Sequence, residues 1–70
     1  MTKDQLINRD QDILGGTPVF RGTRVPIQNL FDYLKEGNTL DQFLYAFPTV
    51  SREQALGVLE LATDELLTHV

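Results

Sequence analysis

Two groups of polar side chains in this 70-residue sequence have the chemistry to contact nucleic acid. Arg21 and Arg24 flank a Gly-Thr pair, so a tight turn brings two guanidinium groups to one edge, and Thr23 adds a hydroxyl donor. Such groups are common partners of phosphate oxygens. Arg52 and Gln54 form the second group, and their side chains suit the edges of guanine and adenine. The sequence therefore indicates phosphate contacts at the first group and base contacts at the second.

A structural role for the same side chains is the alternative. Arg21 and Arg24 can pair with Asp10, Asp12 or helix carboxylates, and would then only fasten the N-terminal segment to the rest of the chain. The second group lies beside Glu53, which would repel phosphates, and a short helix followed by a longer one occurs in any small bundle. Both interpretations remain open at the level of sequence.

The distribution of charge divides the chain into two parts. Residues 1–26 carry four cationic side chains and three carboxylates, a net charge of +1, whereas residues 27–70 carry two and seven, a net charge of −5. An anion is therefore expected at the N-terminal third and a basic partner at the remainder. The overall net charge of −4 excludes a protein that coats nucleic acid by charge alone.

Residues suited to enzyme chemistry are sparse. The chain has no cysteine and a single histidine, His69, so neither a thiolate metal site nor a histidine cluster is expected. Asp10 and Asp12 lie in a polar turn with no apolar pocket to shift a carboxyl pKa, which predicts a solvated turn. The glycines lack the lysine and the strand-loop-helix setting of a phosphate-binding loop. We expect no catalytic residue, metal, cofactor or small-molecule substrate.

A segment rich in glycine and proline, residues 15–26, must position Arg21 and Arg24. Glycine opens backbone angles that other residues avoid, and proline fixes one angle and favours an extended neighbour. Residues 19–21 and 24–25 have extended character on either side of Gly22 and Thr23, which predicts an extended arm or short β-ribbon. Residues 5–9 and 12–14 are each expected as a short strand.

The first expected helix lies between Pro26 and Gly37. Apolar residues recur from Ile27 to Leu34 at the i, i+3, i+4, i+7 spacing of an amphipathic helix. Pro26 is expected at the first helical position, where its missing N–H has no helical partner to lose, and Gly37 is expected just past the last turn.

Two further helices are marked by capping boxes. Thr39 precedes Gln42 by three residues, and Ser51 precedes Gln54 in the same way, so each pair is expected to start a helix. Pro48 should end the earlier one. The order short helix, turn, longer helix resembles a helix-turn-helix, in which the start of the last helix faces the major groove.

The last helix has more apolar surface than one contact requires. Its core stripe is expected at Ala55, Val58, Leu59, Ala62 and Leu66, and its solvated face at Glu53, Gly57, Glu60 and Asp64. Leu56, Leu61 and Leu67 flank the stripe and are the candidate interface residues. A chain this small leaves much of its surface exposed to solvent. The extra apolar surface of this helix therefore predicts a homodimer or another protein partner.

Together these elements predict one mainly α domain over residues 1–70, with an arm at 1–25 and a three-helix bundle at 26–70. The phenylalanines are expected in the core, whereas Tyr45 falls outside the apolar stripe and is expected on the surface. No apolar run approaches the roughly 20 residues needed to cross a bilayer, and the N-terminus lacks a signal-peptide pattern. A cytoplasmic protein with no membrane contact is expected.

Residues 12–26 read DILGGTPVFRGTRVP, and LKEG, FP and SxxQAL follow at 34–37, 47–48 and 51–56. This pattern covers nearly the whole chain and resembles the prokaryotic domain-of-unknown-function family four-three-three. The resemblance implies a homeodomain-like helical fold with an N-terminal extended arm. The signature positions that it implies are Gly16, Pro18, Gly22, Thr23, Arg24, Pro26, Gly37 and Pro48.

Members of that family are often taken to be VapB-type antitoxins, commonly encoded beside a toxin of PIN-like ribonuclease type. The resemblance thus implies an antitoxin-like dimer that binds a toxin through its acidic helical part and operator DNA through the arm and the helix-turn-helix. The alternative is a stand-alone protein-protein interaction module with no nucleic-acid binding, which the negative net charge favours. An enzyme is disfavoured because nucleophile, base and ligand clusters are missing.

Overall fold

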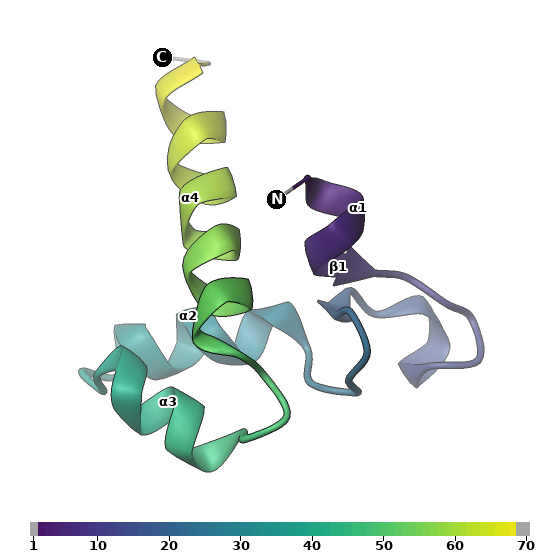
Figure 1. The fold of residues 1–70 in the computed structure, drawn as a ribbon, viewed down its shortest axis with the longest axis horizontal. Helices are drawn as coiled ribbons and strands as arrows, with labels where there is room; N and C mark the ends of the chain where they lie inside the picture. Colours follow the sequence, from purple (N-terminus) through teal and green to yellow (C-terminus); the bar gives the residue numbers. More distant parts are fainter. Residues whose placement is uncertain (1, 69–70) are drawn as a thin grey trace.

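A computed structural model describes residues 2–68 of the chain and is mainly helical (Figure 1). In chain order the elements are α1 (Lys3–Leu6), β1 (Ile7–Asn8), the 3-10 helix η1 (Leu14–Gly16), β2 (Val19–Phe20), α2 (Ile27–Lys35), α3 (Leu40–Ala46) and α4 (Arg52–Thr68). The strands pair antiparallel in a two-stranded sheet. The predicted fold class, a small helical bundle preceded by a short β-ribbon, is confirmed. His69 lies outside the described residues.

Helix α2 begins one residue later than predicted. Pro26 is the N-cap residue with extended backbone angles, and it bridges to Val19 of β2. Proline thus closes the ribbon before the helix begins. At the other end, Gly37 has a φ of 90° and follows the C-cap residue Glu36, which confirms glycine as the residue that ends the helix.

Both predicted capping boxes are confirmed. Thr39 Oγ1 accepts a 3.1 Å hydrogen bond from Gln42 N, and Gln42 Oε1 accepts one of 2.7 Å from Thr39 N. The Ser51 and Gln54 pair is equivalent, at 3.0 Å in each direction. Between α3 and α4, the turn that contains Pro48 is closed by a 3.0 Å hydrogen bond from Val50 N to Phe47 O. Capping therefore fixes where both helices start.

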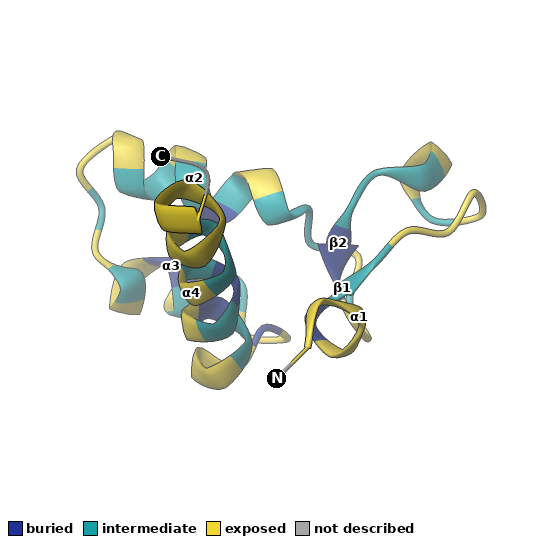
Figure 2. Cartoon of the chain, turned by 90° about the horizontal axis from the view of Figure 1, so that it is seen from above, coloured by how far each residue is buried: buried dark blue, intermediate teal, exposed yellow. Residues whose placement is uncertain are grey.

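One core joins the N-terminal segment to the helices, as the buried residues of Figure 2 show. Its fully buried side chains of largest size are Phe20, Phe43, Leu6, Leu30 and Val19. The Phe43 ring lies 6.0 Å from that of Phe20, 5.7 Å from Tyr33 and 5.1 Å from Phe47, measured between ring centroids. Phe43 on α3 is thus the side chain around which the aromatic residues gather. Tyr45, by contrast, is 90% exposed, as predicted.

The two strands predicted before residue 15 are wrong in large part. Residues 3–6 form the helical turn α1, where Gln5 Oε1 accepts a 2.9 Å bond from Thr2 N, and only Ile7–Asn8 is a strand. Residues 12–14 do not form a strand, although Ile13 itself has extended backbone angles: the Asp10 carboxylate accepts a 2.9 Å bond from Asp12 N, and the Asp10 carbonyl accepts one of 2.8 Å from Ile13 N. These bonds make a tight polar turn.

Two predictions for α4 are also corrected. Gly57 borders the acidic residues as predicted but is only partly exposed: the methyl groups of Leu6 lie 2.9 Å from where a Cβ would stand, so glycine permits α1 to pack on α4. Leu66 does not belong to the core and is 69% exposed. The reason is that α4 extends beyond α2 and α3 (Figure 1), leaving its last turns without neighbours on that side.

Candidate functional site

Arg21 follows β2 and ties the ribbon to α1. Its Nε donates to Asp4 O, its Nη2 donates to Ile7 O at 3.2 Å, and its backbone N donates to Leu6 O at 2.9 Å. A guanidinium is well suited to the unpaired carbonyls at a helix C-terminus. Arg21 therefore has backbone carbonyls as partners, not the carboxylates named as candidates from the sequence, although its side chain remains on the surface.

The turn after Arg21 has the predicted geometry. Gly22 has a φ of 81°, in the left-handed region. The Thr23 hydroxyl donates to Phe20 O at 2.8 Å and accepts from Val25 N at 3.0 Å, so it braces the turn. Arg24 is exposed and, within residues 2–68, has no hydrogen bond or ion pair. Of the pair of arginines, Arg24 is the one with its guanidinium available to a ligand.

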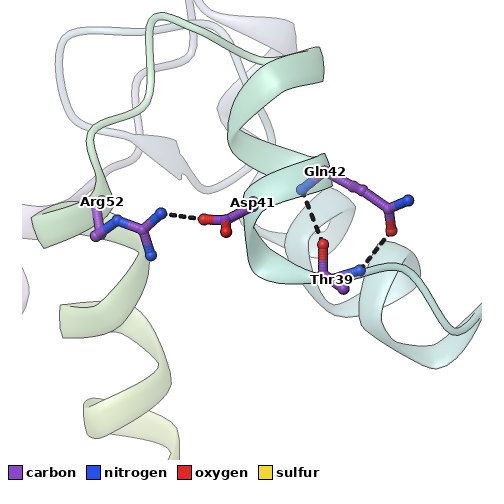
Figure 3. A network of polar contacts seen from close by, with 4 residues as sticks. All are labelled: Thr39, Asp41, Gln42 and Arg52. Atoms are coloured by element: carbon purple, nitrogen blue, oxygen red, sulfur yellow. Dashed lines mark hydrogen bonds and ion pairs between the residues drawn. The ribbon is translucent and has the colours of Figure 1, made fainter.

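Arg52 and Gln54, the candidates for base contacts, are both engaged inside the chain. Arg52 Nη2 forms an ion pair with Asp41 Oδ1 beside the capping box of α3 (Figure 3). Gln54 Oε1 closes the capping box of α4, while its Nε2 donates to Arg21 O at 2.9 Å. The start of α4 is thus bonded to α3 on one side and to the ribbon on the other.

Four cations gather around the ribbon, and we call them the N-terminal cationic edge: Lys3, Arg9, Arg21 and Arg24. The first three line one surface depression together with Asp4 and Asn8. Arg24 lines a second depression, with Gly22 and Thr23, and Asn8 belongs to both. Because Asp4 is the one carboxylate among the residues that line these two depressions, positive potential collects at this edge.

The opposite charge collects on α4. Glu53, Glu60 and Asp64 line a shallow depression of about 350 Å³ whose apolar part includes two of the predicted interface residues, Leu56 and Leu61. Leu61 also packs against the core, whereas Leu56 and Leu67 are 48% and 72% exposed. We call this surface the acidic face of α4. It combines carboxylates with exposed leucines, as surfaces for basic amphipathic segments do.

The remaining signature positions serve the backbone. Gly16 has a φ of 93°, and Pro18 O accepts a 3.0 Å bond from Ile27 N, which holds the loop against the start of α2. Within residues 2–68, no group of three or more His, Cys, Asp or Glu side chains is placed to hold a metal ion. In the same part of the chain, no helix has the length and apolar character to span a bilayer.

Sequence reasoning missed three residues that position these surfaces. Leu6 and Gly57 hold α1 on α4, and Tyr33 stacks edge-on against Phe43 and Phe47. Tyr33 was detectable, since it lies one helical turn from Leu30 on the core side of α2. The contact of Leu6 with Gly57 joins residues 51 positions apart, and no local pattern signals it.

Comparison with known proteins gives a family but no activity. The family model described as a protein of unknown function, DUF433, matches residues 7–62. An uncharacterized protein, y4eO, of Sinorhizobium fredii (strain NBRC 101917 / NGR234) is 38% identical over 50 residues, which cover 71% of this chain and 23% of the relative. This chain thus spans less than a quarter of that relative's length. No solved structure matches. The chain belongs to the DUF433 family, the family that its sequence resembles.

Proposed function

We propose that this protein is the antitoxin-like member of a toxin-antitoxin pair, acting in the cytoplasm as a dimer that neutralises a PIN-like ribonuclease toxin and contacts operator DNA. One observation carries the proposal: the N-terminal cationic edge and the acidic face of α4 are separate surfaces of one small chain. Such a chain has room for an anionic ligand and a basic protein partner at the same time.

On the DNA side, the geometry favours phosphate contacts over base contacts. Arg24 has an available guanidinium beside the rigid Gly22 turn, and Lys3 and Arg9 are exposed in the same region. Arg52 and Gln54 would have to give up intramolecular bonds before they reached a base edge. Operator DNA would therefore be held mainly through its backbone, with strong salt dependence.

On the toxin side, α4 offers the acidic face. Glu53, Glu60 and Asp64 stand beside Leu56, which is half exposed. Carboxylates would steer a basic partner toward the helix, and the leucine would supply apolar contact once it docks. The partner predicted for this face is a cationic, amphipathic segment of the toxin.

The experiment measures both contacts. The chain is co-expressed with the product of the neighbouring gene, and complex formation and relief of growth arrest are recorded; a duplex from its own promoter is titrated separately at several salt concentrations. Arg24→Glu should weaken DNA binding while the protein complex persists, and Glu60→Lys should do the reverse. Lys35→Glu, which changes the net charge as Arg24→Glu does but lies at the end of α2, is the control and should affect neither.

A second candidate is a protein-protein interaction module without nucleic-acid binding. It is favoured by the net charge of −4 and by the intramolecular bonds of Arg52 and Gln54. A stable protein complex, combined with no salt-sensitive binding to the promoter duplex, would select this candidate. Failure of both measurements would remove the antitoxin proposal altogether.

A further inference from the structure

Segments that lie far apart in the sequence surround the depression beside Arg24. Its volume is about 600 Å³, and its lining includes Asn8 of β1, Ile13 of the following loop, Val25 of the ribbon and Thr49. Thr49 belongs to the chain between α3 and α4, which bends toward the ribbon (Figure 1). Separate parts of the molecule thus meet around one open surface in which Arg24 is the cation.

Three of these side chains have hydrogen-bond donors without a partner. The Arg24 guanidinium, the Asn8 side-chain amide and the Thr49 hydroxyl make no hydrogen bond within residues 2–68. Arginine, asparagine and threonine are among the side chains that hydrogen-bond to phosphate oxygens in complexes with DNA. Thr23, which the sequence indicated as the hydroxyl donor, is already engaged in the bonds that brace the ribbon turn. Thr49 therefore supplies the free hydroxyl that Thr23 does not.

We propose that Arg24, Asn8 and Thr49 bind one phosphate group of a nucleic-acid backbone. Gln54 is the residue that positions them. The inference rests on the nucleic-acid contact of the proposed function, to which it adds two contact residues and one positioning residue. Arg24 supplies the positive charge, and the two neutral donors add hydrogen bonds to other oxygens of the same phosphate. Because the depression has more room than one phosphate fills, the adjoining sugars lie against its apolar side chains.

The charges around the depression favour an anion. Asp10 and Asp12 precede Ile13 in its loop, yet neither lines the depression, and the Asp10 carboxylate accepts the bond from Asp12 N. The acidic face of α4 is a separate surface that shares no lining residue with this one. A phosphate at Arg24 therefore has a cation beside it and no carboxylate in the same depression.

Gln54 joins two of the segments that form the site. Its Nε2 donates to Arg21 O at 2.9 Å, three residues before Arg24. Its Oε1 accepts a 3.0 Å bond from Ser51 N, two residues after Thr49. One side-chain amide thus holds the ribbon turn against the chain that leads into α4. Without the bond to Arg21 O, Arg24 and Thr49 would lose the fixed spacing that a shared phosphate requires.

The first test separates the two bonds of the Gln54 side chain. Gln54→Glu retains an oxygen for the capping box but loses the N–H group that donates to Arg21 O. The start of α4 is therefore kept while the link to the ribbon is broken. The affinity for the promoter duplex should fall about fivefold or more, and its salt dependence should decrease by about one phosphate contact.

Gln42→Glu is the matched control. Gln42 has the same place in the capping box of α3, where its Oε1 accepts from Thr39 N, and within residues 2–68 it has no bond to the ribbon. The substitution changes the net charge equally, so it should lower the affinity far less than Gln54→Glu does. Equal losses would mean that charge alone accounts for the effect, and Gln54 would not be a positioning residue. Thermal melts followed by circular dichroism verify that both variants fold.

A double-mutant cycle distinguishes positioning by Gln54 from a direct contact between Gln54 and a base. In the Arg24→Ala background the phosphate contact is already lost, so Gln54→Glu should cause little further loss of affinity. A base contact would keep its full effect in that background. Additive losses would therefore overturn the positioning role.

Thr49→Val tests the hydroxyl of the site, because it removes the donor at an exposed position with little change in shape. The affinity for the duplex should fall about threefold or more. Thr63→Val is the control, since Thr63 is also exposed but lies on α4, outside the lining of the depression. This variant should bind the duplex like the wild type.

Three ligands identify the source of the phosphate: the promoter duplex, one of its strands alone, and inorganic phosphate. Each is titrated while the amide NMR signals of Asn8, Arg24 and Thr49 are recorded. A nucleic acid should shift these signals at concentrations where inorganic phosphate does not, and equal shifts with inorganic phosphate would overturn the inference.

The outcomes separate this inference from the proposed function. Shifts with the single strand alone would support the inference and remove the operator duplex from the proposed function. Duplex binding that Gln54→Glu and Thr49→Val both leave intact would overturn the inference while the DNA contact stands. Absence of binding to either nucleic acid would remove both.

Discussion

Residues 2–26 and residues 27–68 contribute to one core but acquire their shapes by different means. The helical part is built from short-range bonds, with a capping box at the start of α3 and of α4 and a left-handed glycine after α2. The N-terminal part has only four residues in paired strands. Its loops are held by longer-range bonds, such as those from Phe20 N to Val25 O and from Ile27 N to Pro18 O, each 3.0 Å.

This difference implies different costs of disruption. A helix with its own caps keeps its local order when one distant contact is lost. The ribbon and α1 depend on a few attachments, chiefly Leu6 in the core and the side-chain bonds of Arg21 to α1 and β1. Because these segments carry the N-terminal cationic edge, the positions of its cations depend on the attachment of α1 to α4.

Replacement of Phe43, the buried side chain that contacts both regions, should have the largest effect on stability. Phe43→Ala removes a fully buried ring that contacts Phe20 of the ribbon as well as Tyr33 and Phe47. We expect a loss of about 3 to 5 kcal/mol in the free energy of unfolding, a large part of the stability of so small a domain. Chemical denaturation measures this loss.

Tyr45→Ala is the control for that variant. Tyr45 lies on the same helix and is 90% exposed, so its removal should change stability by less than about 0.5 kcal/mol. If both variants had similar stability, the aromatic cluster would not be the common core of the two regions.

Substitutions at Gly57 and Leu6, which lie in contact, test the attachment of α1 alone. Gly57→Ala places a methyl group 2.9 Å from the Leu6 methyls, so it should destabilise the protein by about 1 to 3 kcal/mol despite the better helix propensity of alanine. Hydrogen exchange should show the loss of protection concentrated in α1 and β1. Uniform loss over α2 and α3 would contradict separate attachment.

The Leu6→Ala background supplies the control. With the Leu6 methyls gone, the new alanine at position 57 meets no clash, and its helix propensity should make the same substitution stabilising by up to about 1 kcal/mol. A change of sign between the two backgrounds is the expected signature, and equal effects in both would show that the close approach is unimportant.

The same contrast explains what the sequence could predict. Capping boxes, the glycine after α2 and the i, i+3, i+4 spacing act within a few residues, so all three main helices were predicted close to their observed bounds. The left-handed Gly22 turn is also local, and its geometry was predicted correctly. Each of these features needs only neighbours along the chain.

The missed features depend on distant partners. A helical turn at Lys3–Leu6 is too short to show periodicity, and Gly57 reads as a solvated position until Leu6 is placed on it. For the candidate site, the sequence identified Arg21 and Arg24 but did not show which guanidinium is available to a ligand. Arg21 bonds to a carbonyl of a helix that was not predicted, so that of these two exposed cations only Arg24 is without a bond within residues 2–68.

The two arginines of the ribbon should therefore differ in stability effect. Arg21→Ala removes two side-chain bonds at a surface position, one to Asp4 O of α1 and one to Ile7 O of β1, and a loss of about 1 kcal/mol is expected. Arg24→Ala removes no bond within residues 2–68 and should change stability by less than about 0.5 kcal/mol. The denaturant midpoints of the two variants, measured side by side, test this difference. A larger loss of stability for Arg24→Ala would show that Arg24, not Arg21, is the arginine that holds the ribbon.

An arginine of the helical part should have the smallest effect. Arg52 pairs with Asp41, but their side chains are 55% and 76% exposed, so water and salt screen the attraction. A double-mutant cycle with Arg52→Ala and Asp41→Ala should give a coupling of less than about 0.5 kcal/mol that declines as salt is added. Since the capping boxes of α3 and α4 remain, neither helix loses its start. A coupling larger than the effect of Arg21→Ala would mean that the helical part, like the ribbon, depends on an arginine for its attachment, and the contrast between the two regions would fail.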